Sequence, residues 1–184
     1  MTDAGSIRRA GPDDAAAIAG VHVRAWRAAY RGLVPQDYLD ALDAEQRAGA
    51  WAQVLAATAW PSTGVFVATG PGASGPDTVV GFSAIGPSRD EDADPAVVGE
   101  IHTVYVDPDA WAGGIGSRLV GRATDELRGA GFCRATLWTL DTNARARRFY
   151  EGRGWVLDGV TKRHDWGAFV ATDVRYVMDL GARP

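Results

Sequence analysis

The glycines of the run Gly113-Gly-Ile-Gly116 are the first residues whose type and spacing could do chemistry. They follow an apolar run, Val97 to Val106, and precede a segment whose apolar residues recur at helical spacing. Because glycine has no Cβ, backbone N–H groups in such a loop can approach a ligand closely. The start of a helix also carries partial positive charge, so this arrangement can bind phosphate. A tight turn between a strand and a helix would look the same, and that structural interpretation stays open.

Two well-known phosphate-binding motifs are excluded by the residues around this loop. A P-loop ends in Gly-Lys-Ser or Gly-Lys-Thr, and the single lysine of the chain is the distant Lys162. A dinucleotide-binding loop needs a third glycine where Leu119 stands. Any phosphate bound here would therefore be held in another way.

A second group of residues lies further along the chain, where Asn143, Ala146, Phe149 and Tyr150 recur at helical spacing. Asn143 and Tyr150 are two helical turns apart, so their side chains share one face of the predicted helix. Each also has an ordinary structural interpretation, since Asn143 is a good N-cap and Tyr150 could be a half-buried aromatic residue. The spacing by itself does not decide between these roles.

Two titratable side chains on the predicted strand could act as a general base. Glu100 and His102 are two residues apart, so they share a face of that strand. The ordinary pKa of histidine suits proton transfer at neutral pH. The structural alternatives are a carboxylate at the strand end for Glu100 and a packed, hydrogen-bonded ring for His102. Cys133 has no partner base nearby, and we interpret it as a buried packing residue.

The elements that must position these residues follow from periodicity and from Gly and Pro boundaries. The sequence predicts helices over 12–30, 44–57, 113–129 and 143–152, strands over 65–69, 78–85, 97–106, 134–140, 155–160 and 170–180, and a turn over 70–76. The strand–loop–helix–strand unit from Val97 to Leu140 should cross over right-handed and pair its strands in parallel. The predicted fold is one α/β domain over 1–184, with a mixed, mostly antiparallel twisted sheet, a central parallel βαβ unit and flanking helices.

Composition and charge exclude several classes of protein. The chain has 184 residues and a net charge of −4, which argues against a dedicated nucleic-acid binder. A single cysteine excludes a disulfide scaffold, and the scattered His22, His102 and His164 do not form a zinc motif, so no metal is expected. No apolar run approaches the ~20 residues of a membrane span, and the first residues lack the apolar core of a signal peptide. We expect a cytoplasmic protein with no membrane partner. The acidic loop over 88–95 could be a solvated surface or a rim that attracts a cationic substrate.

Three runs resemble, in the right order, the motifs of the GCN5-related N-acetyltransferases. These runs are Glu100-Ile-His-Thr-Val-Tyr-Val-Asp-Pro108, Trp111-Ala-Gly-Gly-Ile-Gly-Ser-Arg-Leu119 and Asn143-Ala-Arg-Ala-Arg-Arg-Phe-Tyr-Glu-Gly-Arg-Gly-Trp155. The resemblance covers nearly the whole chain, because the order of predicted elements matches as well. It implies direct transfer of an acetyl group from acetyl-CoA to a primary amine of a small molecule, an amino acid or a peptide terminus.

The resemblance also implies a role for each matching position. The strand that carries Val104 to Val106 would bulge and splay from the next parallel strand, and Tyr150 would protonate the departing thiolate while Glu100 or His102 served as the base. The expected CoA-binding residues are Val104, Tyr105, Val106, Trp111, Ala112, Gly113, Gly114, Ile115, Gly116, Ser117, Asn143, Ala146 and Tyr150. Trp111 departs from the family pattern, which usually has Gln or Arg there, so the phosphate loses one polar or charged neighbour.

Several alternatives remain at this point. A non-catalytic acyl-CoA-binding regulatory module would share these motifs, and an RNA-associated module could use the arginine-rich helix.

One or two of the arginines on the helices after the glycine loop and after Asn143 could face the CoA phosphates; these are Arg118, Arg122, Arg145, Arg147, Arg148 and Arg153. The aromatic residues Trp26, Tyr30 and Trp51 could be core residues or could line the acceptor pocket. The C-terminal strand, Thr172 to Leu180, could complete the sheet of a homodimer.

Overall fold

Seven strands and five α-helices make up the part of the chain that the structure, a computed structural model, describes: residues 5–72 and 75–181. The strands are β1 (Ile7–Arg9), β2 (Gly64–Gly72), β3 (Gly75–Pro87), β4 (Val98–Val106), β5 (Arg134–Leu140), β6 (Val156–Asp165) and β7 (Val170–Asp179). The helices are α1 (Ala15–Ala29), α2 (Gln36–Asp40), α3 (Ala44–Ala56), α4 (Ile115–Gly129) and α5 (Ala144–Glu151).

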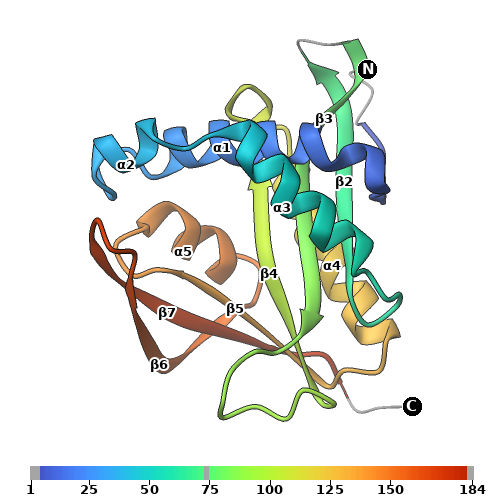
Figure 1. The fold of residues 1–184 in the computed structure, drawn as a ribbon. Coiled ribbons are helices and arrows are strands. Elements are labelled where there is room, and N and C mark those ends of the chain that lie inside the picture. The colour runs from blue at the N-terminus through green and yellow to red at the C-terminus, as the bar shows by residue number, and fades with distance from the viewer. Residues whose placement is uncertain (1–4, 73–74, 182–184) are drawn as a thin grey trace.

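All seven strands belong to one sheet, in the order β1-β2-β3-β4-β5-β7-β6 (Figure 1). β4 and β5 are parallel, and every other neighbouring pair in the described sheet is antiparallel. The predicted mixed, mostly antiparallel sheet with a central parallel βαβ unit is therefore confirmed.

Helices cover both faces of the sheet because its strands are apolar on both sides. Along β2, Val65 and Val67 pack against α1 and α3, while Phe66 and Ala68 pack against α4. This alternation is the period of two that a strand imposes on its side chains. The resulting two-sided core holds β4, the strand with the candidate site residues, between two helical layers.

The structure differs from the sequence prediction in α2, which was not predicted, in the start of α4 at Ile115 instead of Gly113, and in the strands β1, β2, β3 and β6. β1 has three residues and was not predicted, since so short a strand shows no periodicity. β2 and β3 extend into the predicted turn over 70–76, and residues 73–74 between them lie outside the described part. β6 continues beyond Val160 to Asp165, because it pairs with β7 again after a register shift between Leu157 and Thr161.

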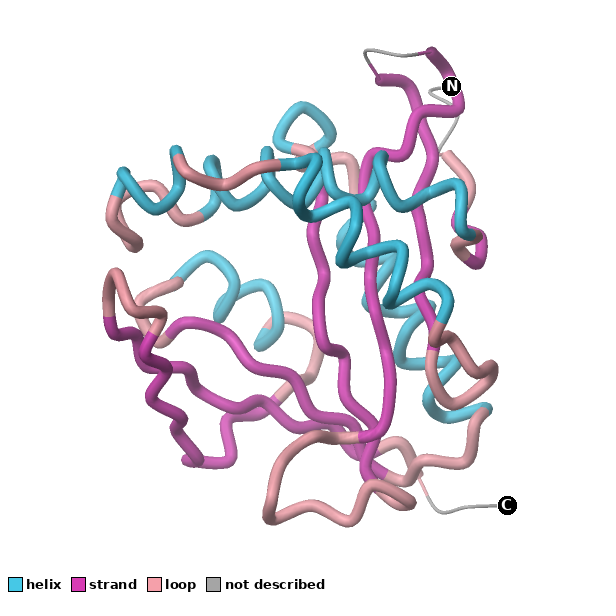
Figure 2. The backbone as a smooth tube through the Cα atoms, in the orientation of Figure 1, coloured by secondary structure: helices cyan, strands magenta, loops and turns pink. Residues whose placement is uncertain are grey.

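β4 and β5 pair over a short stretch and then separate. The registered partners are Val98 with Arg134, Gly99 with Ala135 and Glu100 with Thr136. Beyond them β5 turns away from β4, as the backbone trace shows (Figure 2). On its other edge β4 pairs with β3 as far as Val106. The main chain of β4 after Glu100 therefore has no strand partner on the β5 side.

A β-bulge interrupts the pairing of β4 with β3 at His102. Ala84 pairs with Thr103 and Ile85 pairs with Ile101, so His102 is the extra residue. Ile101 and Val104 both pack against the α4 core although they are three residues apart, which a regular strand would not permit. The bulge thus changes which side chains of β4 face each helical layer.

The strand β7 has no free edge for a second copy of the chain. It pairs with β5 along one side and with β6 along the other. The suggestion that residues 172–180 complete the sheet of a dimer is therefore wrong for this strand. The outer strands of the sheet are β1 and β6.

Candidate active site

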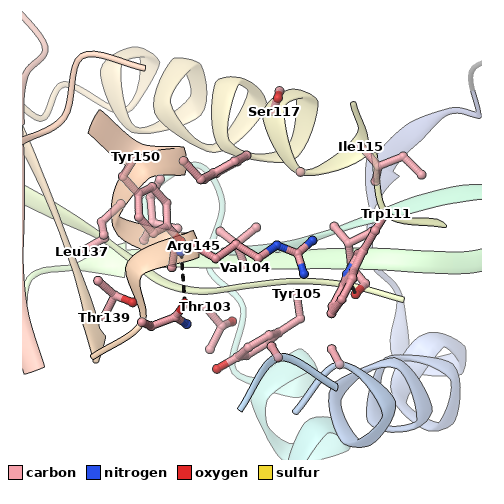
Figure 3. Close-up of a pocket in the computed structure, with 18 of the residues that line it drawn as sticks. Thr103, Val104, Tyr105, Trp111, Ile115, Ser117, Leu137, Thr139, Arg145 and Tyr150 are labelled. Carbon is pink, nitrogen blue, oxygen red and sulfur yellow. Dashed lines mark hydrogen bonds between the residues drawn. The ribbon is translucent and has the colours of Figure 1, made fainter. Parts of the chain in front are cut away.

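A cavity of about 420 Å³ opens where β4 and β5 separate (Figure 3). Its lining comes from β4, the loop before α4, β5, α5 and the end of α1. Among the residues predicted from the sequence, the lining contains His102, Val104, Tyr105, Val106, Trp111, Ala112, Gly114, Ile115, Gly116, Ser117, Asn143, Ala146 and Tyr150. Gly113 and Glu100 lie outside it.

The β4 wall of the cavity presents both main chain and a polar side chain. Thr103, Val104, Tyr105 and Val106 line it in sequence, on the edge that β5 has left. The hydroxyl of Thr103 is buried and has no hydrogen-bond partner among the residues described. Sequence analysis did not single out Thr103, because a threonine on a strand is ordinary and the bulge that turns it inward leaves no sequence signal.

The loop before α4 supplies unpaired N–H groups. Ala112 and Gly114 are in the left-handed region, with φ of 64° and 77°. The first hydrogen bond back into the helix comes from the N–H of Arg118, which donates to the carbonyl of Gly114. The N–H groups of residues 115–117 therefore have no partner within α4, and these residues line the cavity. This arrangement suits an anion such as phosphate.

Asn143 combines its structural role with a place in the site. Its Oδ1 accepts a hydrogen bond of 3.0 Å from the N–H of Ala146, which caps α5. The same side chain is buried and lines the cavity. Asn143 can therefore be both the N-cap of α5 and a residue of the site, the two interpretations that the sequence left open.

Tyr150 is one of three tyrosines that line the cavity. Tyr30 and Tyr105 share a hydrogen bond of 3.2 Å between their hydroxyl groups, and both line the cavity with Tyr150. Burial raises the pKa of Tyr150 well above its ordinary value. The phenol therefore carries its proton at neutral pH.

His102 and Glu100 are joined through Arg89. The Nδ1 of His102 lies 3.2 Å from an Arg89 guanidinium nitrogen, and its Nε2 lies 3.2 Å from the carbonyl of Pro87. Since a guanidinium can only donate and a carbonyl can only accept, the ring is the neutral tautomer with its proton on Nε2. Burial and the charge of Arg89 lower the pKa of His102 to about 4. The lone pair on Nδ1 thus already accepts the hydrogen bond from Arg89.

Glu100 is buried and lies outside the cavity lining. One of its oxygens, Oε2, accepts a hydrogen bond of 3.0 Å from the backbone N–H of Arg89. Burial raises the pKa of Glu100 above its ordinary value, and this effect outweighs the hydrogen bond from Arg89. Its other oxygen takes part in no hydrogen bond within the described residues, so it can accept a proton.

The acidic loop over 88–95 is bound to the sheet. Arg175 of β7 is buried and forms ion pairs with Asp90 and Asp92 of the loop and with Asp158 of β6. Trp138 also donates a hydrogen bond of 3.0 Å to Asp90. The charges of Asp90 and Asp92 therefore hold the loop in place, and with it Arg89 against Glu100 and His102.

Two of the six arginines considered in the sequence reach the cavity. Arg145 on α5 and Arg153, two residues after the end of α5, are part of its lining. Arg122 pairs with Glu126 and Arg147 pairs with Asp141 instead. Of the three aromatic residues of the first helices, Tyr30 lines the cavity, whereas the rings of Trp26 and Trp51 belong to the buried core.

The described residues form neither a cluster suited to a metal ion nor a helix suited to a membrane. Within them, no three His, Cys, Asp or Glu side chains gather as they would around a metal ion. Likewise, none of the helices in that part of the chain is long and apolar enough to span a membrane.

Sequence comparison decides the family. The profile of the acetyltransferase (GNAT) family matches residues 23–155, which include β4, the loop, α5 and most of the cavity lining. This chain is a member of the GNAT family. An uncharacterized N-acetyltransferase of Bacillus subtilis, YuaI, is 30% identical to this GNAT protein over 138 residues, covering 75% of this chain and 73% of the relative. A probable N-acetyltransferase of Mycobacterium tuberculosis, Rv2775, is 28% identical and covers 84% and 82%.

Solved structures show that the fold is shared as well. The putative acetyltransferase YncA from Salmonella typhimurium, solved with acetyl-CoA, superposes with a TM-score of 0.69 at 21% identity, covering 98% of this chain and 96% of that one. The PaiA N-acetyltransferase from Thermoplasma acidophilum, solved with coenzyme A, gives a TM-score of 0.67 at 17% identity, covering 95% and 98%. At 17% and 21% identity, these superpositions show that the two solved proteins share the fold of this GNAT protein.

Proposed function

We propose that this GNAT protein transfers an acetyl group directly from acetyl-CoA to the primary amine of a small molecule, an amino acid or a peptide terminus. The observation that carries the proposal is the cavity between β4 and β5. There, unpaired main chain on β4, free N–H groups at the start of α4 and the phenol of Tyr150 line one continuous space. Two proteins of the same fold were solved with coenzyme A or acetyl-CoA.

Each part of the cavity suits a part of the donor. The main chain of residues 104–106 can hydrogen-bond the pantetheine arm as a neighbouring strand would, with Asn143 on the opposite wall. The N–H groups of residues 115–117 can bind the diphosphate. Tyr150 then lies at the thioester end, where a proton is needed.

The reaction requires one base and one acid. We assign the base to Glu100, acting through a water molecule, because its carboxylate keeps a free oxygen while the Nδ1 of His102 is engaged by Arg89. The base takes a proton from the substrate ammonium, and the neutral amine attacks the thioester carbonyl. A main-chain N–H of β4 near the bulge stabilises the oxyanion. The C–S bond breaks, Tyr150 gives its proton to the thiolate, and the extra proton on the nitrogen of the new amide passes to the Tyr150 phenolate, which restores the phenol.

The decisive experiment follows thiol release from acetyl-CoA with a panel of primary amines. Tyr150→Phe should lower kcat at least about 100-fold and change the Kd for CoA little, because it removes the acidic hydroxyl and keeps the ring that lines the cavity. Tyr38→Phe is the matched control, since that phenol lies outside the cavity lining. Full activity in Tyr150→Phe would contradict its assigned role. Tight CoA binding without turnover of any amine would favour the alternative, a non-catalytic regulatory module.

A further inference from the structure

The guanidinium of Arg145 lies over the ring of Trp111 at the loop end of the cavity. Its Cζ atom is 3.7 Å from the ring centroid, and both residues line the cavity. In Figure 3 the side chain of Arg145 extends from α5 toward the Trp111 ring. The contact thus joins the two segments that border the cavity, α5 and the loop before α4.

Trp111 has a fixed orientation of its own. Its indole Nε1 donates a hydrogen bond of 2.8 Å to the carbonyl of Val106, the last residue of β4. The ring therefore presents one face to Arg145 from a position set by the sheet. A cation on an aromatic face is stabilised by the ring quadrupole, and an arginine also stacks flat on it. The pair restricts where the guanidinium can lie.

Arg145 pairs with no carboxylate of the described residues, unlike Arg147 and Arg122. Arg147 on the same helix pairs with Asp141 at 2.7 Å, and Arg122 on α4 pairs with Glu126 at 3.0 Å. Among the ion pairs formed by residues 5–72 and 75–181, none includes Arg145. A guanidinium that is held on Trp111 with its donors free, in the same cavity as the unpaired N–H groups of residues 115–117, matches the paired oxygens of a phosphate.

We propose that Arg145 binds a phosphate group of coenzyme A and that Trp111 is a positioning residue that holds Arg145 for this purpose. The proposal rests on the proposed function, since it takes the cavity to be the CoA site. An indole carries no charge and cannot itself neutralise a phosphate. In this chain α5 would therefore supply, through Arg145, the positive charge that the residue at position 111 does not.

A purely structural stack makes a different prediction. If the Arg145–Trp111 pair only joined the loop to α5, breaking it would weaken every ligand of the cavity alike. If Arg145 binds phosphate, its substitution should raise the Kd for CoA and leave the Kd for pantetheine unchanged. Pantetheine has the same arm as CoA but lacks the nucleotide and the diphosphate. The two ligands therefore separate the two roles.

The test measures Kd for CoA, dephospho-CoA and pantetheine with the wild type, Arg145→Gln and Arg148→Gln. Arg148 is the matched control, because it lies on the same helix, carries the same charge and is exposed outside the cavity lining. Arg145→Gln should bind CoA about 10-fold more weakly, with a shallower dependence on salt, and bind pantetheine unchanged. Arg148→Gln should stay within about twofold of the wild type. A loss that persists with dephospho-CoA assigns Arg145 to the diphosphate, and one that disappears assigns it to the 3′-phosphate.

A double-mutant cycle tests the role of Trp111. Trp111→Leu should weaken CoA binding, and adding it to Arg145→Gln should weaken binding no further, because the ring acts through the guanidinium. Additive losses, equal losses for pantetheine, or an Arg145→Gln variant as tight as Arg148→Gln would overturn the proposal. A wild type that binds no CoA would instead remove the proposed function, and this inference with it.

Discussion

At the scale of single residues, the chemistry depends on which atoms are still free to accept or donate a proton. His102 has the more suitable ordinary pKa, yet its Nδ1 accepts from Arg89 and its Nε2 donates to Pro87. Glu100 lies outside the cavity lining but has a free oxygen and a raised pKa. Hydrogen bonding, rather than the ordinary pKa, thus favours Glu100 as the base.

The pH dependence of kcat/KM should separate these two residues. The acidic limb of the wild-type profile should lie above the ordinary pKa of glutamate, because burial raises that of Glu100 and the base works only when ionised. Glu100→Gln should lose at least about 100-fold in kcat/KM and lose this limb. His102→Gln should lose less and keep the limb. If His102 were the base, its removal would abolish the limb, which would then lie near its pKa of about 4.

At the scale of elements, the site depends on two interruptions in the pairing of β4, a bulge opposite β3 and the separation from β5. The bulge at His102 turns this side chain over Gly86 of β3, where a Cβ would lie 2.6 Å from the Cε1 atom of the ring. Position 86 therefore requires glycine because the His102 ring lies too close for a Cβ atom, and not because of the backbone conformation at that position. Separation from β5 after Glu100 then opens the cavity on the other edge.

Two glycine variants should have opposite effects on stability. Gly86→Ala should lower both the free energy of unfolding and kcat, because the new methyl group displaces His102 from the bulge. Gly121→Ala, on the exposed face of α4 with nothing near the added Cβ, should raise the free energy of unfolding by up to about 1 kcal/mol. Chemical denaturation of both variants measures the difference. Equal effects of the two substitutions would contradict the packing described at Gly86.

At the scale of the whole molecule, helices cover both faces of the sheet, and a histidine is buried between the sheet and the layer formed by α1 and α3. His22 of α1 accepts a hydrogen bond of 3.1 Å on its Nδ1 from the indole of Trp51 on α3. Burial, aided by the charge of Arg47, lowers the pKa of His22 to about 3. His22 is therefore neutral in the folded protein at every pH at which the enzyme is expected to work.

This burial links stability to pH. An unfolded histidine binds a proton below about pH 6.5, whereas folded His22 stays neutral until about pH 3. Between these values protons favour the unfolded chain, so stability should fall as pH is lowered, by up to about 1.4 kcal/mol per pH unit from this group. His22→Gln should show a smaller slope in denaturation measured from pH 7 to pH 4. Identical slopes in the two proteins would show that His22 is not buried as described.

The sequence was sufficient to predict the features that depend on residues close together in the chain. The parallel βαβ unit, the loop at Gly113–Gly116 and the cap at Asn143 follow from periodicity and from residue type over short distances. The bulge at His102, the anchoring of the acidic loop by Arg175 and the stacking of Arg145 on Trp111 depend on contacts between residues far apart in the chain. Such contacts leave no periodic pattern, so only the folded structure could assign them.

A crystal structure with bound coenzyme A would show directly whether the cavity between β4 and β5 is the CoA site. We expect the pantetheine arm between the separated ends of β4 and β5, its sulfur close to the hydroxyl of Tyr150 and its diphosphate at the N–H groups of residues 115–117. Coenzyme A bound elsewhere, or β4 and β5 paired beyond Glu100 so that the cavity is closed, would contradict this expectation.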